Sequence, residues 1–137
     1  MSGASRAYGE GRDLIPAIAE PTIVFMINKS LPPGSWTDED VYRATRYSWK
    51  IGNDARERAV YALGVSHGVV QGAYRVESWH QADGNRWCFE GHPAPELDVV
   101  GKSIARIKAR QGSSNPVRLF LDGIPEAPRD GSADISR

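Results

Sequence analysis

The sequence has almost no cysteine, since Cys88 is the only one in 137 residues. A single thiol excludes an internal disulfide and excludes a zinc site built from several cysteines. Such a chain suits a reducing compartment better than a secreted one, so we expect it in the cytoplasm. We also expect no bound metal and no cofactor.

Long hydrophobic runs are missing as well. No stretch approaches the roughly 18 consecutive apolar residues that a membrane-spanning helix needs. The opening residues, MSGASRAYGEGRD, lack the apolar segment of a signal peptide. The sequence therefore predicts no membrane partner and no export by that route.

The chain carries no excess of charge, because 17 Lys and Arg balance 17 Asp and Glu. The net charge therefore predicts no long-range attraction to nucleic acid or to an acidic membrane, and any basic surface must be local. The composition does not indicate the oligomeric state.

What the sequence does contain is typical of a globular protein, with 40% apolar and 25% charged residues. A chain of this length forms one hydrophobic core. The ends are rich in Gly, Ser, Pro and charge without apolar periodicity. We therefore expect a single domain over residues 13–123, with flexible tails at 1–12 and 124–137.

Local patterns predict the elements of this domain. The β-branched run 21–27 is typical of a buried central strand. Thr37 followed by Asp38, Glu39 and Asp40 places a capping hydroxyl before three carboxylates, which predicts a helix over about 38–46. A shorter helical turn is expected at 53–59.

The best pattern is a β-hairpin, in which two alternating strands, 61–65 and 70–76, flank the turn His67-Gly68. Gly64 and Gly72 lie inside the strands, as expected for a bulge, a bend or a close backbone approach. Further strands are expected near 86–90 and 116–121, and 101–110 could be helical or extended. The fold class is therefore α+β, with a small curved antiparallel sheet or open pseudo-barrel and short flanking helices.

Catalytic motifs are weak. Gly101-Lys102-Ser103 ends like a phosphate-binding loop, but Glu96 stands where that loop needs glycine. Cys88 with His80 or His92 would suit a nucleophile and its base. A buried thiol with surface imidazoles is the simpler interpretation. We expect a binding module rather than an enzyme. The alternative is a small hydrolase or nuclease that would use the same cleft in which we expect a ligand to bind.

Aromatic and basic residues point instead to ligand binding. Trp49, Trp79 and Trp87 lie at the ends of elements, where flat rings could line a pocket and stack on a base. They could equally be lids on the core. Between Val99 and Leu121 there are basic residues and no acidic one, as on a surface that follows a phosphate backbone or on a solvated loop. The candidate phosphate contacts are Arg46, Lys102, Arg106, Asn115 and Arg118.

The order of these features resembles a known family. An apolar strand, a short helix, the segment with Trp49, and a hairpin containing Val70-Gln71-Gly72-Ala73-Tyr74 follow one another. This order is similar to the PUA-like superfamily, particularly its YTH and EVE branches, over about residues 21–121. The resemblance implies an open pseudo-barrel that binds RNA or DNA, often holding a modified base in an aromatic pocket.

The resemblance also implies site residues. Trp49 takes the position of a cage aromatic, with Ser48 and Lys50 beside it. Trp79 and Trp87 have no matched cage position and are added as neighbours. We therefore expect a nucleic-acid-binding module that stacks a base on Trp49, and a protein-interaction module is a third interpretation.

Overall fold

The computed structural model describes residues 13–31, 36–107 and 116–126. Two helices and five strands follow in the order β1 Thr22–Met26, α1 Asp38–Arg46, α2 Asn53–Arg58, β2 Tyr61–Ser66, β3 Val69–Gln81, β4 Trp87–Pro93 and β5 Val117–Phe120. Single 3-10 turns lie at Pro95–Leu97 and Ala105–Ile107. The predicted strands and helices are all present within two or three residues of their expected bounds, except that β3 and β4 extend further.

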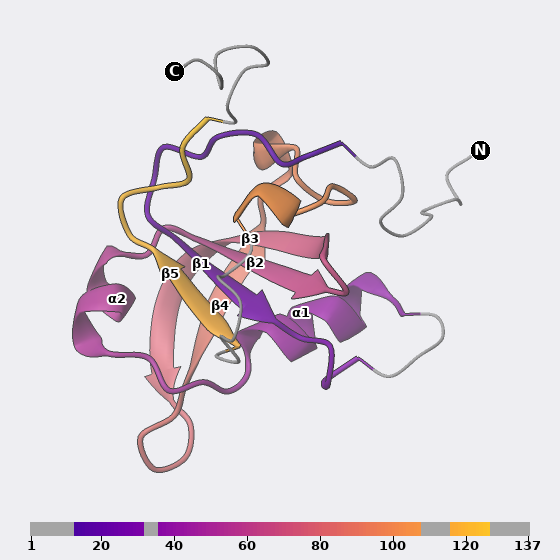
Figure 1. Cartoon of the computed structure of the whole chain (residues 1–137). Coiled ribbons are helices and arrows are strands. Elements are labelled where there is room, and N and C mark those ends of the chain that lie inside the picture. The colour runs from indigo at the N-terminus through magenta and orange to yellow at the C-terminus, as the bar shows by residue number, and fades with distance from the viewer. Residues whose placement is uncertain (1–12, 32–35, 108–115, 127–137) are drawn as a thin grey trace.

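The strands form one sheet in the order β4-β3-β2-β1-β5, which is open and not closed into a barrel (Figure 1). The expectation of a purely antiparallel sheet is wrong for one pair, because β1 and β2 run parallel. Parallel neighbours need a crossover connection, and the chain between them, which contains α1 and α2, provides it. The mixed sheet and the two helices confirm the α+β class.

The central strand β1 is buried on both faces. Ile23, Phe25 and Ile27 point to the face that α1 and α2 cover, and Val24 points to the other. That second face is covered by residues far apart in the sequence, including Ile15, Ile104 and Ile124. Burial on two sides explains why this strand is a continuous apolar run.

Helix α1 begins where the sequence predicted. The Thr37 side chain accepts a hydrogen bond from the Asp40 amide at 3.1 Å, and the Asp40 carboxylate accepts one from the Thr37 amide at 2.9 Å. These hydrogen bonds from and to Thr37 lower the pKa of Asp40. The reciprocal capping box fixes which residues face the sheet, and Val41, Ala44 and Thr45 are buried there.

The hairpin turn and the strand glycines serve distinct purposes. His67 and Gly68 both have positive φ, at 52° and 80°, as a tight two-residue hairpin requires. At Gly64 the register shifts in a bulge, and a Cβ there would collide with the side chain of Thr45 on α1. Gly64 therefore lets the helix approach the sheet closely, which is one of the three roles expected for it.

The free edge of β4 is covered by α1 and the residues that follow it. The Arg46 guanidinium donates to the carbonyl of Phe89 at 2.8 Å, and the Tyr42 hydroxyl accepts from the Gly91 amide at 3.0 Å. Trp49 and Trp87 exchange two backbone hydrogen bonds of 2.8 and 2.7 Å. Edge strands that are covered in this way cannot pair with other chains.

The predicted tails are only partly described. Ile124, placed at the start of the C-terminal tail, is buried and bridges to Ile18. Residues 1–12 and 127–137 lie outside the described residues, and so does the whole stretch 108–115, which includes Asn115. Within the described ranges, no helix is both long and apolar enough to cross a lipid bilayer.

Candidate functional site

The structure places Trp49 in the core. Trp49 is only 9% exposed, and its ring stacks on the ring of Phe25 with centroids 4.8 Å apart. The indole N–H donates to the carbonyl of Thr45 at 2.8 Å, so its polar atom is satisfied inside the protein. Trp49 is therefore a core residue and not the wall of an open pocket. This position agrees with the alternative interpretation, in which the tryptophans cover the core.

The other two tryptophans do not complete a cage around Trp49. Trp79 packs edge-on against Phe89, with centroids 5.6 Å apart. Trp87 is half-buried, and the guanidinium of Arg56 lies over its ring at 3.7 Å from the centroid. No stacking contact joins the three tryptophans in the described part of the chain.

The two residues beside Trp49 also have ordinary surroundings. The carbonyl of Ser48 accepts a hydrogen bond from Arg86 at 3.2 Å, which ties this segment to the loop between β3 and β4. Lys50 is exposed and points away from the core. Neither residue lines either of the two cavities described in this structure.

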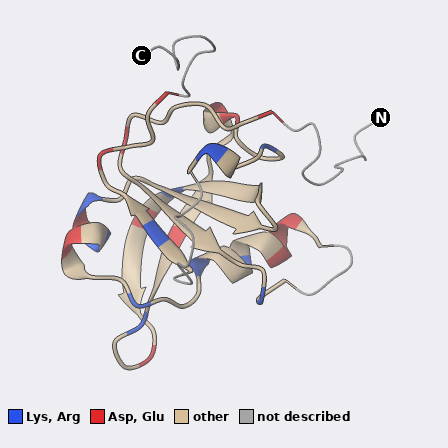
Figure 2. Ribbon diagram, viewed as in Figure 1, with Lys and Arg blue, Asp and Glu red and all other residues tan. Residues whose placement is uncertain are grey.

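The predicted phosphate contacts do not form one basic face. Arg46 is paired with Glu90 at 2.8 Å, and Lys102 is paired with Asp98 at 3.1 Å. The Nε atom of Arg106 donates to a backbone carbonyl at 2.8 Å. Arg118 lies on β5 and has interaction partners of its own, and Asn115 lies outside the described residues. Figure 2 shows Lys and Arg spread over separate elements, with Asp and Glu between them.

The residues considered for catalysis lie on β3 and β4 and are not joined by hydrogen bonds to one another. Cys88 is buried, and its sulfur accepts a hydrogen bond of 3.9 Å from the Arg46 guanidinium. His80 contacts the Ser78 hydroxyl, and His92 contacts the carboxylate of Glu77. His80 is the cross-strand partner of Cys88 in the pairing of β3 with β4. Among the described residues, no hydrogen bond joins the thiol to either imidazole, and no group of three ligands suited to a metal is found.

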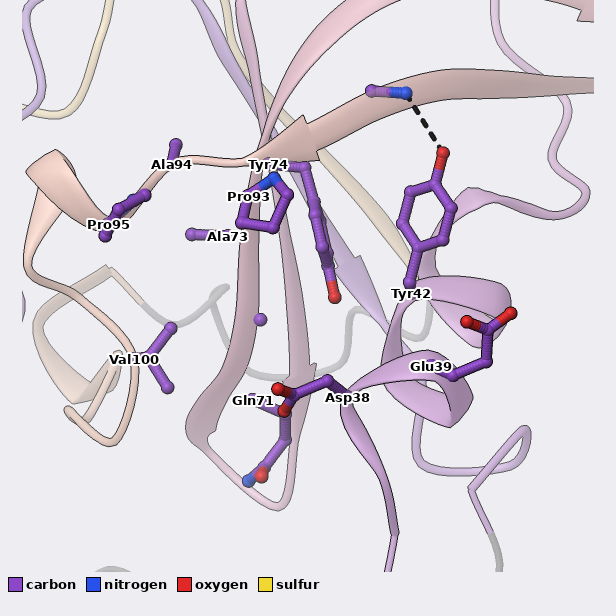
Figure 3. Close-up of a pocket in the computed structure, with 12 residues that line it drawn as sticks. Asp38, Glu39, Tyr42, Gln71, Ala73, Tyr74, Pro93, Ala94, Pro95 and Val100 are labelled. Atoms are coloured by element: carbon purple, nitrogen blue, oxygen red, sulfur yellow. Dashed lines mark hydrogen bonds between the residues drawn. The ribbon is translucent and has the colours of Figure 1, made fainter.

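A concave site lies elsewhere, between α1 and the segment after β4. It is a cavity of about 420 Å³, whose floor is β3 and whose walls are α1 on one side and residues 93–100 on the other (Figure 3). Pro93, Pro95 and Val100 make one wall apolar. This volume falls within the range of small-molecule sites in proteins.

Tyr74 is the central residue of this cavity. Its ring packs on Tyr42 with centroids 5.1 Å apart, and Figure 3 shows its hydroxyl pointing into the cavity toward Asp38 and Gln71. Burial, with a smaller effect of the Asp38 charge, raises the pKa of Tyr74 well above its usual value. The hydroxyl therefore stays protonated, and it has no hydrogen-bond partner in the described structure.

Two further polar groups line the cavity together with Tyr74. Gln71 is only 9% exposed, and its Nε2 atom donates to the carbonyl of Val69 at 3.3 Å, which leaves its Oε1 atom without a partner among the described residues. Asp38 is exposed at the first turn of α1, and no ion pair engages it there. The site thus holds two unpaired acceptors and one hydroxyl that can donate or accept.

Sequence reasoning missed this site, because its residues looked like parts of ordinary elements. Asp38 was interpreted as a charge that offsets the helix dipole, and Gln71 and Tyr74 as alternating strand residues. Gly72 is the signal that could have found it. A Cβ at Gly72 would collide with the Tyr74 hydroxyl and would lie 2.8 Å from Val41, so the glycine makes room for the tyrosine.

Comparisons of the chain with protein-family models, with curated proteins and with solved structures find no match.

Proposed function

We propose that this protein is a binding module that takes a single unstacked nucleobase into the cavity beside Tyr74. The observation that carries the proposal is the set of unpaired polar atoms on Tyr74, Gln71 and Asp38, gathered at one end of a cavity with apolar walls. Unpaired polar atoms beside apolar walls in a concave site are groups that a ligand can engage in place of water.

The shape of the cavity favours a flat ring. A heterocycle can lie between the wall of Pro93, Pro95 and Val100 and the wall formed by α1, with its edge toward the polar end. In this position the ring buries apolar surface on its faces and forms hydrogen bonds along its edge, which is how single-stranded bases are recognised.

An organic ammonium ion fits the cavity less well, although Asp38 and Glu39 add negative charge to its lining. Cation-binding cages use the faces of aromatic rings. Here the face of Tyr42 already carries the guanidinium of Arg46, 5.6 Å from its centroid, and Tyr74 presents its hydroxyl. These contacts favour a neutral ring that donates hydrogen bonds.

The surrounding charges also shape the proposal. The carboxylates that line the cavity repel phosphate, and Lys102 is already paired with Asp98. Binding should therefore depend mainly on the base and only weakly on salt. The resemblance of the sequence to the PUA-like superfamily implies the same class of ligand, bound by an open pseudo-barrel. We also propose that the protein is located in the cytoplasm.

The test is calorimetric titration of the intact chain with free nucleosides and with short single-stranded oligonucleotides of RNA and DNA. We expect at least one base to bind, with a dissociation constant that changes little between low and physiological salt. Comparing nucleosides with oligonucleotides distinguishes a free ligand from a base in a strand.

The Tyr74→Phe variant removes only the hydroxyl, and it should weaken binding about 2- to 10-fold, as expected for one hydrogen bond. Tyr61→Phe is the matched control, because Tyr61 is equally buried but packs on the opposite face of the sheet. If no nucleoside or oligonucleotide binds, or if both variants lose affinity equally, the cavity is not a nucleobase site. Tighter binding of a methylated ammonium ion would assign it to that ligand instead.

A further inference from the structure

The polar atoms at the end of the cavity are mostly acceptors. Asp38 contributes a carboxylate, and Gln71 contributes an Oε1 atom whose amide nitrogen is already engaged by Val69. Both residues line the cavity together with Tyr74 (Figure 3). A ligand that satisfies this set must present several N–H donors on one edge.

The four common bases differ in this respect. Adenine and cytosine each place one amino donor next to a ring-nitrogen acceptor, and uracil or thymine places one N–H between two carbonyls. Guanine alone has two adjacent donors, the ring N1–H and the exocyclic amino group. Two parallel donors match the two oxygens of a carboxylate, which makes a charge-assisted bidentate contact.

The remaining group in the cavity agrees with the same ligand. Guanine carries a carbonyl oxygen next to its N1–H, and this oxygen needs a donor. The Tyr74 hydroxyl can donate, because burial holds it in its protonated form. The cavity therefore offers acceptors for the two guanine donors and a donor for the neighbouring guanine acceptor.

We infer that the cavity selects guanine among the bases, with Asp38 as the residue that determines the preference. This inference rests on the proposed nucleobase-binding function and adds the identity of the base. The carboxylate accepts from N1–H and from the amino group, and the Oε1 atom of Gln71 provides a further acceptor for the amino group.

The experiment measures the binding of five single-stranded pentanucleotides that differ only in the central base, which is guanine, adenine, cytosine, thymine or hypoxanthine. Hypoxanthine retains the N1–H of guanine and lacks its amino group. We expect guanine to bind at least about tenfold more tightly than adenine, cytosine and thymine, as one good bidentate contact provides, with hypoxanthine between them.

The variant Asp38→Asn keeps the size of the side chain and replaces one acceptor oxygen with a donor. It should abolish the preference for guanine while other bases still bind. Asp54→Asn is the matched control, because Asp54 also lies in the first turn of a helix, is exposed, and belongs to α2 away from the cavity. This control should retain the full preference.

The outcomes separate the two proposals. Equal binding of all five oligonucleotides, or a preference for another base, overturns the selection of guanine and leaves the nucleobase site standing. A preference for guanine that survives in Asp38→Asn overturns the role of Asp38. If no oligonucleotide binds, both the proposed function and this inference fail.

Discussion

Two groups of aromatic residues lie on the same face of the sheet, and they differ in what their polar atoms do. In the first group, Trp49 stacks on Phe25 and its indole N–H donates to Thr45. In the second group, Tyr74 packs on Tyr42, but its hydroxyl faces a cavity and has no partner among the described residues. Both side chains are almost fully covered, at 9% and 5% exposed. The two rings therefore differ in the state of their polar atom and hardly in their exposure.

The largest effect on stability should come from truncating Trp49, whose indole N–H already has a hydrogen-bond partner inside the protein. Trp49→Ala removes a buried indole and leaves a cavity in the core, which should lower the free energy of unfolding by about 3–5 kcal/mol. Urea denaturation followed by circular dichroism measures this loss. Trp87→Ala, at a half-buried ring beneath Arg56, should cost less. If Trp49→Ala unfolds like the parent chain yet loses base binding, the distinction between the two groups is wrong.

The next effect concerns the glycine beneath Tyr74. Gly72→Ala places a methyl group 2.8 Å from Val41 and against the Tyr74 hydroxyl, so either the ring or α1 must shift. Overpacking of this kind should cost about 1–3 kcal/mol of stability and should remove base binding. Thermal unfolding and titration with nucleosides measure the two losses.

A second glycine provides the control for Gly72→Ala. Gly52→Ala adds the same methyl group where no atom lies within 4 Å. Its cost should be limited to the loss of a glycine at a helix N-cap, under about 1 kcal/mol. Unchanged base binding by Gly72→Ala would show that the position of Tyr74 is unimportant to the site.

A smaller effect on stability is expected from changes at Thr37, the N-cap of the helix α1 that forms one wall of the cavity. Thr37→Ala removes the side-chain acceptor for the Asp40 amide and should cost about 1 kcal/mol. Thr37→Ser keeps the hydroxyl and should retain most of the stability. Chemical denaturation of the three proteins under one set of conditions makes the comparison. Equal losses in the alanine and serine variants would mean that the cap does not stabilise α1.

The smallest effect at neutral pH should be that of Tyr74→Phe, because the hydroxyl it removes has no partner in the protein alone. A difference should appear in alkaline solution. The folded pKa of Tyr74 lies above its value of about 10 in unfolded chains, so the folded state holds its proton more tightly. The contribution of Tyr74 to stability is therefore complete below pH 10 and is lost as the pH rises above it.

Urea denaturation of the parent chain and Tyr74→Phe, between about pH 8 and pH 11, tests this dependence. The parent should lose stability more steeply above pH 10 than the variant, and the difference isolates Tyr74 from the other titrating groups. Parallel curves for the two proteins would mean that the hydroxyl is not shielded from water.

The sequence predicts the elements of this fold well where the signals are local. Thr37 and the carboxylates after it locate α1, and His67-Gly68 locates the hairpin turn. The parallel pairing of β1 with β2 was missed, because it depends on how the chain from 27 to 60 crosses over the sheet and leaves no mark within either strand. The residue pattern of a strand, alternating or wholly apolar, does not depend on whether the neighbouring strand runs parallel or antiparallel to it.

The candidate site was harder to predict for a related reason. Tryptophan is the residue type that most often suggests a stacking platform, and Trp49 stands in an extended segment, but whether its N–H finds a partner depends on the backbone of α1. Asp38, Gln71 and Tyr74 converge only when α1 has packed against β3. Gly72, two positions before Tyr74 on the same face of a strand, carried the one local sign of that arrangement.

The cover over β4 has a consequence for the behaviour of the protein in solution. Tyr42 both lines the cavity and holds the Gly91 amide through its hydroxyl, and Arg46 one turn later holds the carbonyl of Phe89. When α1 loosens, the hydrogen-bonding groups of an edge strand become available to a second molecule. An occupied cavity restrains the same helix, so a bound ligand should also protect the protein from self-association and aggregation.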